Sequence, residues 1–275
     1  MKSKNFSRFL WVLIVATQLF FFISALKSNH TRSADSAEYL YMAYNLQHHG
    51  LIYSGDAEAA ERDLSLYSRR TPGYPLFLLV GMIGIGSGIL PLAIQCLLSL
   101  LSIYLGSRIL RSIHPAETAQ SLYLALLLFF PSQFIYPAFY MTETLFQSAL
   151  LLSIFFLFRF EERGTYSLYY LHHFFLAAMY LVKPAAMFLW LGVTLYSIFS
   201  HHFVGVNRRQ VFISLLHILL LGSIFIKNHQ RTGIAEYSSI GRKLIINYNL
   251  PDLLTYTKGA DYSARVIDSL QQQLK

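Results

Sequence analysis

The chain has 275 residues, of which 55% are hydrophobic, 16% aromatic and only 13% charged. Soluble domains carry about 25% charged residues, so this composition excludes a water-soluble globule and indicates a polytopic membrane protein. The net charge of +8 would suggest nucleic acid as the partner of a soluble chain, but membrane proteins collect Lys and Arg in cytoplasmic loops, and we expect no nucleic-acid partner.

Apolar runs along the chain predict an all-α integral membrane fold with about seven transmembrane helices. The first run follows Lys2, Lys4 and Arg8 and has no convincing cleavage site after it, which indicates an uncleaved signal anchor with a cytoplasmic N-terminus. The predicted spans cover residues 9–26, 89–110, 119–134, 143–160, 166–182, 184–200 and 211–226.

The glycine-rich run 73–88 could be an eighth span or a helix that does not cross. If it does not cross, every inner loop obeys the rule that basic residues stay in the cytoplasm. We therefore predict a re-entrant or interfacial helix inside a large outer loop, residues 27–88. The membrane module then covers residues 1–226, and residues 227–275 form an extracytoplasmic tail. The cytoplasmic arginines would be Arg108, Arg111, Arg159, Arg163, Arg208 and Arg209.

The outer loop contains a predicted amphipathic helix over residues 33–46, with Asp35 at its start and Glu38 three residues later. This spacing has two interpretations. The pair resembles a capping box, in which carboxylates bind free backbone donors. Alternatively, Asp35 is a general base or metal ligand at the membrane surface.

Arg69 and Arg70 precede a rigid Pro72–Gly73 turn and an apolar helix. A guanidinium group donates two parallel hydrogen bonds to phosphate oxygens, so this pair at headgroup depth suits a lipid phosphate. The alternative is that both arginines only snorkel to generic anionic headgroups.

Glu143 opens a predicted span and Lys183 lies between two others, both on the outer face. Charged groups at span ends are candidates for function, although Glu143 would also favour a helix N-terminus through the dipole. Carboxylates are ligands for Mg or Mn, so Asp35 and Glu143, with Glu38, are candidate ligands of a divalent cation.

The histidine pairs 48–49, 172–173 and 201–202 are adjacent in sequence, so the two members of a pair cannot share one helix face. We interpret them as interfacial histidines rather than metal ligands. The glycines of residues 84–88 lack a preceding strand, and we interpret them as helix packing or a kink rather than a phosphate loop.

Taken in order, these motifs resemble the polytopic GT-C-fold glycosyltransferases that use polyprenyl-phosphate sugars, a group that includes protein O-mannosyltransferases and aminoarabinose transferases. The resemblance covers residues 8–245. Its motifs are Asp35-x-x-Glu38-Tyr39, the run Arg70-Thr71-Pro72-Gly73-Tyr74-Pro75, Thr142-Glu143, Lys183-Pro184, Asn228, Gly233 and Ser238-Ser239-Ile240-Gly241.

The resemblance implies an inverting sugar transfer, on the outer face of a bacterial cell membrane, from a polyprenyl-phosphate donor to an acceptor at the first outer loop. It implies that Asp35 helps to deprotonate the acceptor and that Glu143 is the second acidic residue. Arg70 and Lys183 would contact the donor phosphate, and the motifs that hold Arg69, Glu38 and Tyr39 would bind substrate.

The sequence departs from the family at Ser36, where O-mannosyltransferases have a second acidic residue, and at Thr71-Pro72, where a proline pair is common. These differences leave the subfamily open. Family members also continue through further spans, so we expect a fragment that holds the donor site and lacks part of the acceptor site.

The alternative class is a protein without catalysis, either a transporter or a lipid-phosphate-binding subunit. A transporter places ionisable groups near the bilayer midplane, whereas the predicted spans are nearly free of charge. A lipid-binding subunit needs Arg70 and Lys183 but not Asp35.

Overall fold

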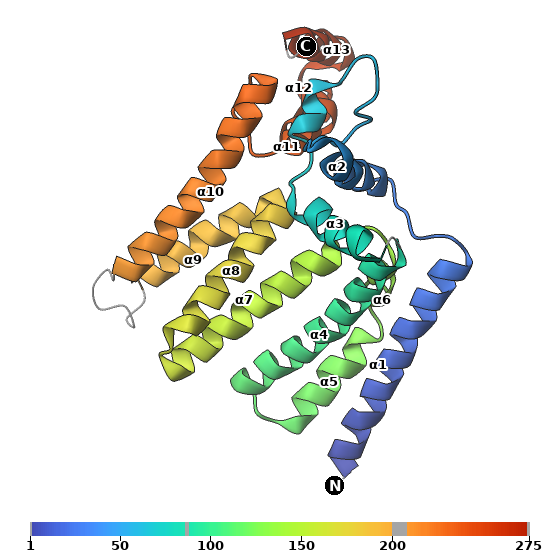
Figure 1. Ribbon diagram of the computed structural model, residues 1–275, viewed down its shortest axis with the longest axis vertical. Coiled ribbons are helices and arrows are strands. Elements are labelled where there is room, and N and C mark those ends of the chain that lie inside the picture. Colours follow the sequence, from blue (N-terminus) through green and yellow to red (C-terminus); the bar gives the residue numbers. More distant parts are fainter. Residues whose placement is uncertain (1, 86–87, 200–207, 274–275) are drawn as a thin grey trace.

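The computed structural model describes residues 2–85, 88–199 and 208–273, and within these ranges the protein is entirely helical (Figure 1). Long helices lie side by side in a layer, and successive members run in opposite directions (Figure 1). They are α1 (Lys2–Lys27), α4 (Ile89–Ile113), α5 (Glu117–Leu127), α7 (Glu143–Arg163), α8 (Tyr166–Val182), α9 (Met187–Phe199) and α10 (Arg208–Thr232).

Four helices of the described chain are long and apolar enough to cross a membrane, which supports the prediction of an integral membrane protein. They are Asn5–Lys27, Ile89–Ile113, Glu143–Arg163 and Phe212–Thr232. A fifth span is possible if Glu117–Leu127 and Ser132–Ala138, which meet at 75°, form one broken crossing.

The prediction of seven spans was wrong. Helix α8 has 17 residues, about 25 Å at 1.5 Å per residue, against a hydrocarbon thickness of about 30 Å. Helix α9 has 13 described residues and begins only after Pro184 and a short 3₁₀ turn, η3 (Pro184–Ala186). The predicted span 119–134 is interrupted before α6 (Ser132–Ile135), where Pro131 stands at the bend.

The shorter helices gather at the end of the layer opposite the N-terminus (Figure 1). Helix α2 confirms the helix predicted over residues 33–46, shifted by three residues, and α3, at 13 residues, is about 20 Å long and shorter than a span. These elements are α2 (Ser36–His49), η1 (Leu64–Tyr67), α3 (Gly73–Ile85), η2 (Tyr136–Ala138), α11 (Ser239–Leu244), η4 (Ile245–Asn249), α12 (Leu250–Lys258) and α13 (Ala260–Gln273).

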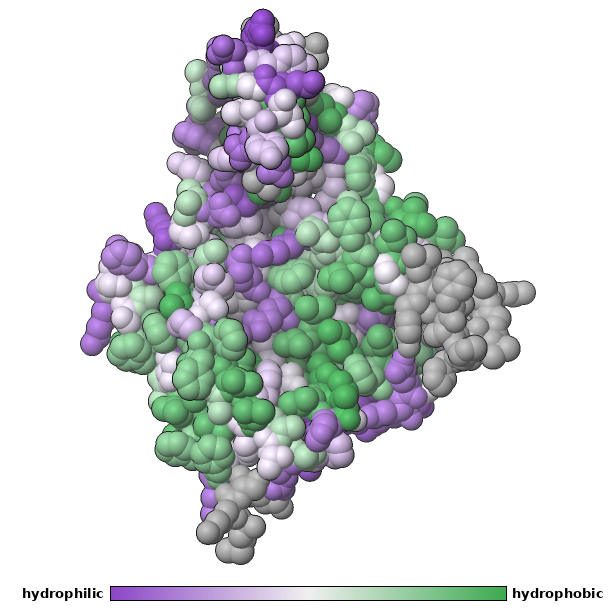
Figure 2. Space-filling view, turned by 180° about the vertical axis from the view of Figure 1, so that it is seen from behind, coloured by the Kyte–Doolittle hydropathy of each residue, from purple (hydrophilic) through white to green (hydrophobic). Residues whose placement is uncertain are grey.

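Hydropathy follows the same division. In Figure 2 the upper part of the molecule, with the C-terminal helices, is mainly hydrophilic, and hydrophobic residues gather lower down over the long helices. An apolar cluster holds α2 and α3 on the end of the layer, and it consists of Tyr39, Ala43, Tyr74, Leu78, Leu92 and Tyr140. The charged residues of the outer loop pack on this cluster, with Arg70 against Tyr39.

The histidines of α8 were predicted to lie at the membrane interface, and this was wrong. His172 and His173 are 2% and 5% exposed. His172 Nδ1 lies 2.8 Å from both the Ser153 carbonyl and its hydroxyl, and His173 Nδ1 lies 3.1 Å from His217 Nε2. Both rings are buried because α7 and α10 supply these partners. His48 and His49 are exposed at the end of α2, and His201–His202 lie outside the described residues.

Candidate functional site

The residues that the sequence offered as a site lie at one end of the helical layer. Asp35 directly precedes α2, and Arg70 lies three residues before α3. Glu143 is the first residue of α7, and Lys183 directly follows α8. These helix ends meet on the side opposite the N-terminus (Figure 1).

Arg70 is the centre of a charged cluster formed with α2. Its Nη2 donates to Asp35 Oδ1 at 2.7 Å and its Nη1 to Asp35 Oδ2 at 3.3 Å. Its Nε donates to Glu38 Oε2 at 2.5 Å, and Arg69 Nη1 lies 2.9 Å from Glu38 Oε1. Two carboxylates therefore balance two guanidinium groups.

The spacing of the acidic residues explains why both reach Arg70. Residues three apart lie on the same face of a helix, so the first turn of α2 presents Asp35 and Glu38 together. Asp35 occupies the N-cap position but makes no side-chain capping bond. Both carboxylates bind arginine instead, and the capping-box interpretation was wrong for this pair.

The turn before α3 fixes the arginines against α8. Thr71 Oγ1 donates to the Val182 carbonyl at 2.9 Å. A Cβ at Gly73 would lie 2.6 Å from the carbonyl carbon and oxygen of Leu181, so no larger residue fits without moving the backbone. This contact brings the Arg70 turn beside the end of α8, where Lys183 begins the next connection.

Tyr39 lies beneath the charged cluster and is 6% exposed. Its hydroxyl accepts a hydrogen bond from Arg70 Nη1 at 3.2 Å, and its ring centroid lies 4.9 Å from the guanidinium carbon. Burial raises the pKa of Tyr39, so it stays neutral. Burial lowers the pKa of Arg70, but Tyr39 and the bonds to Glu38 and Asp35 outweigh it and raise the pKa overall, so Arg70 stays a cation.

The second charged pair is Glu143 with Lys183. Lys183 Nζ donates to Glu143 Oε1 at 2.9 Å, and both side chains are about one-third exposed. Glu143 Oε2 is buried and has no hydrogen-bond partner among the described residues. Asp35 and Glu143 both lie close enough to Tyr39 to raise its pKa, so the two charged groups lie near the same tyrosine.

A pocket of about 300 Å³ opens beside the Glu143–Lys183 pair. Polar side chains line it together with Tyr136 and Phe146, and they include Ser132, Gln133, Thr144 and Gln147. Gln147 Nε2 donates to Gln133 Oε1 at 2.8 Å, so the amides are held in place. The pocket offers hydrogen-bonding groups of both kinds, which suits a ligand rich in hydroxyl groups.

Exposure differs sharply across the Arg70 cluster. The Asp35 side chain is 54% exposed, whereas the Arg70 side chain beneath it is 9% exposed. Asp35 is therefore the member of the cluster that an incoming molecule can reach first, and Arg70 can act on that molecule only through its exposed edge.

In the described part of the chain, no three His, Cys, Asp or Glu residues are grouped so that they could hold a metal ion. The carboxylates suggested as ligands for Mg or Mn face cations of the protein instead. Asp35 binds Arg70 and Glu143 binds Lys183.

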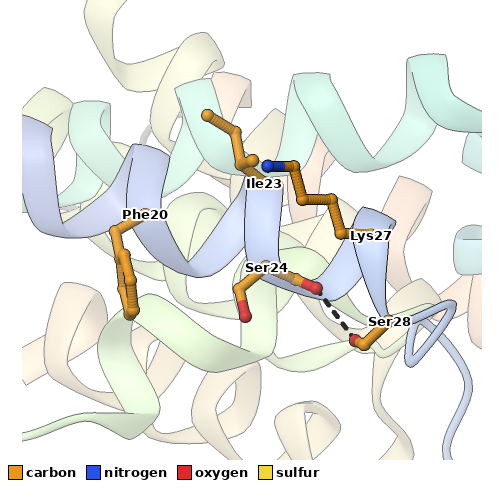
Figure 3. A pocket seen from close by; sticks show the side chains of 5 residues that line it. All are labelled: Phe20, Ile23, Ser24, Lys27 and Ser28. Carbon is orange, nitrogen blue, oxygen red and sulfur yellow. Dashed lines mark hydrogen bonds between the residues drawn. The ribbon is translucent and has the colours of Figure 1, made fainter.

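A separate pocket of about 540 Å³ runs along the end of α1. Figure 3 shows its side chains, which include Phe20, Ile23 and Lys27, and the hydrogen bond of 2.9 Å from Ser28 Oγ to the Ser24 carbonyl. The predicted site residues do not appear among its described lining residues, so it is distinct from the charged site.

The sequence reasoning missed the part that the C-terminal segment plays at the site. Ser68 Oγ donates to Glu236 Oε1 at 2.8 Å, and Ser238 Oγ donates to the Arg69 carbonyl at 2.8 Å. Glu236 also accepts hydrogen bonds from Arg242 at 3.0 and 3.1 Å. The serines after Gly233 belong to the motifs of the family resemblance, but a contact across 168 residues leaves no local signal in the sequence.

No family model matches this chain, and neither a curated protein nor a solved structure shows significant similarity to it. The fold and site therefore define a helical protein with four or five candidate membrane spans and a charged cluster at one end. No family is identified.

Proposed function

We propose that the protein is a membrane glycosyltransferase that moves a sugar from a polyprenyl-phosphate donor to an acceptor outside the cytoplasm. The observation that supports this most is that Asp35, Glu38 and Glu143 lie with Arg69, Arg70 and Lys183 at the ends of apolar helices. A donor with a lipid tail, an anionic phosphate and a sugar would meet apolar, cationic and hydrogen-bonding groups there.

In the proposed reaction, the acceptor oxygen forms a bond to the anomeric carbon of the sugar while the bond from that carbon to the phosphate oxygen breaks. Polyprenyl phosphate leaves with the electron pair, and Asp35 takes the proton from the acceptor hydroxyl. Asp35 is suited to this role because it is the exposed carboxylate of the cluster.

Cations would stabilise the charge that develops on the leaving phosphate. Arg70 would supply positive charge from its buried position beside Asp35, and Arg69 and Lys183 would make further contacts with the phosphate. Arg70 is bound to two carboxylates, so the donor phosphate would replace part of that contact and free Asp35 for the acceptor. The pocket beside Glu143 would take the sugar.

The proposed orientation rests on the charge of the short connections between the helices. The end of the layer away from the site carries the basic residues Lys2, Lys4, Arg8, Arg108, Arg111, Arg159 and Arg163. Short cytoplasmic connections collect Lys and Arg, so on this count the end away from the site would face the cytoplasm. The longer segments at the site end also carry basic residues, among them Lys27, Lys183 and Lys227. We propose on this basis that the acceptor arrives from outside, and the family resemblance adds the expectation of a bacterial inner membrane.

The test is a transfer assay in membranes with a radiolabelled polyprenyl-phosphate sugar. We expect Asp35→Asn to lower the rate by at least about 100-fold, because general-base catalysis contributes that much. Asp56→Asn is the matched control, since Asp56 is an exposed carboxylate of the same loop whose side chain accepts a hydrogen bond from the Glu58 amide. Unchanged transfer in Asp35→Asn would exclude Asp35 as the base.

A lipid-phosphate-binding subunit without catalysis is the second candidate. It would use Arg70 and Lys183 to bind the lipid phosphate, and the contact of Asp35 with Arg70 would then be structural rather than catalytic. Donor binding without any transfer, equal in wild type and Asp35→Asn, would support this candidate over the enzyme.

A further inference from the structure

A second polar pocket lies at the end of the helical layer away from the charged site, between the last turns of α4 and α7. It has a volume of about 330 Å³. Both helices run from the site end toward this end, and each is a candidate membrane span. The pocket therefore lies where a span leaves the hydrocarbon core, at the depth of lipid headgroups.

Three arginines converge on this pocket from the two helices. Arg108 and Arg111 come from α4, and Arg159 comes from α7 together with Glu162. Arg159 Nη1 lies 2.7 Å from Glu162 Oε2, so one positive charge is balanced. Arg108 and Arg111 have no hydrogen bond or ion pair with the other described residues, and the pocket keeps two unbalanced charges.

The wall also has an aromatic part. Phe155 and Phe158 line the pocket, and the Arg159 guanidinium lies 5.6 Å from the centre of the Phe155 ring. A pocket with two free guanidinium groups above an aromatic wall matches a molecule that combines a phosphate with acyl chains, because guanidinium binds phosphate oxygens in pairs and apolar rings contact the chains.

We infer that this pocket binds the headgroup phosphate of an anionic glycerophospholipid. Basic pockets between transmembrane helices at this depth are sites for such headgroups. The inference does not depend on the proposed glycosyl transfer. A different role, in which the arginines only complement the dipoles at the C-terminal ends of α4 and α7, requires no pocket and no preference among lipids.

The experiment is native mass spectrometry of the purified full chain in detergent with equal amounts of phosphatidylglycerol and phosphatidylcholine. We expect wild type to retain phosphatidylglycerol at least about tenfold better, since each Arg near a headgroup contributes to anionic lipid binding. Arg108→Gln/Arg111→Gln should lose this preference. Arg163→Gln, a change of an exposed arginine at the same end but outside the pocket, should keep it.

If the double variant kept its preference for phosphatidylglycerol, the inference would be overturned. An equal loss of this preference in Arg163→Gln would also overturn it, because net charge alone would then explain the binding. Equally tight binding of soluble glycerol 1-phosphate would identify a free phosphate rather than a lipid and would also overturn it. If the double variant does not fold, the same lipid-retention measurement on Arg108→Lys tests the inference. This variant keeps the charge but loses the paired donors, and we expect about threefold weaker retention, against no change if only charge matters.

Discussion

Arg70 holds the Asp35 carboxylate with both terminal nitrogens, at 2.7 and 3.3 Å, although 35 positions separate the two residues. The same guanidinium uses its remaining Nε for Glu38. One buried cation thus fixes the start of α2 against the turn that begins α3. The arrangement makes the two acidic partners unequal, since Glu38 is 21% exposed and Asp35 is 54% exposed.

The first prediction compares the two carboxylates. Glu38→Gln should lower the free energy of unfolding by about 1–3 kcal/mol, because Glu38 binds both arginines and its loss leaves Arg70 partly unpaired in a buried position. Asp35→Asn should cost less than about 1 kcal/mol, since water screens the exposed partner. Denaturation in detergent, followed by circular dichroism, measures both. A larger loss for Asp35→Asn would contradict the assigned geometry.

The second prediction concerns the close approach of the α3 turn to α8. Gly73→Ala should lower the unfolding free energy by about 1–3 kcal/mol, because its Cβ would meet the Leu181 backbone at 2.6 Å. Gly222→Ala in α10 is the control, since a Cβ there meets nothing within 4 Å and alanine favours a helix. We expect the control to be neutral or more stable. Equal melting temperatures for wild type and Gly73→Ala would refute the contact.

The third prediction concerns Gln95, a buried side chain near the site that forms three hydrogen bonds. Tyr74 Oη donates to Gln95 Oε1 at 2.6 Å, and Gln95 Nε2 donates to the Phe139 and Pro137 carbonyls at 2.8 and 3.2 Å. Gln95→Ala should cost at least about 2 kcal/mol of stability, because it leaves buried polar groups unpaired. The same change at exposed Gln47 should cost little. Comparable unfolding midpoints for both variants would show that these hydrogen bonds are dispensable.

The fourth prediction is a loss of stability at alkaline pH. Burial raises the pKa of Tyr39 above its ordinary 10.0, so the folded chain keeps this proton at pH values where the unfolded chain releases it. Stability is therefore complete below pH 10 and falls as the pH rises toward the folded pKa. Tyr39→Phe should reduce the fall without abolishing it, because burial also raises the pKa of Tyr74. Unfolding followed from pH 9 to 12 tests this, and an unchanged slope in Tyr39→Phe would refute it.

Local sequence patterns predicted the elements that depend on local chemistry. The spacing around Tyr39 and Ala43 predicted α2, and the Pro72–Gly73 turn predicted the start of α3. Charge placement also grouped Asp35 with Arg70 on one face, and the structure brings them into contact. These features follow from periodicity, turn residues and charge, which act over a few neighbouring residues.

The errors have two sources. Seven spans were predicted because apolar runs too short for a full crossing were counted, such as α8 with 17 residues, and because the run 119–134 bends at Pro131. The burial of side chains depends instead on distant partners. Adjacency of His172 and His173 suggested an interface, because the sequence does not reveal that Ser153 and His217 meet them inside the layer. The hydrogen bond from Ser68 to Glu236 could not be predicted for the same reason, because the two residues are far apart in the sequence.

The most direct test of the central claim is retention of a polyprenyl-phosphate sugar by the detergent-purified chain, measured by native mass spectrometry in wild type and Arg70→Gln. Circular dichroism confirms that the variant is folded, and Lys258→Gln, a change of an exposed basic residue at the end of α12, is the control. We predict specific retention by wild type and by the control, and at least about a tenfold loss in Arg70→Gln. Equal, weak retention by all three proteins would contradict the claim that this cluster binds a lipid-linked sugar.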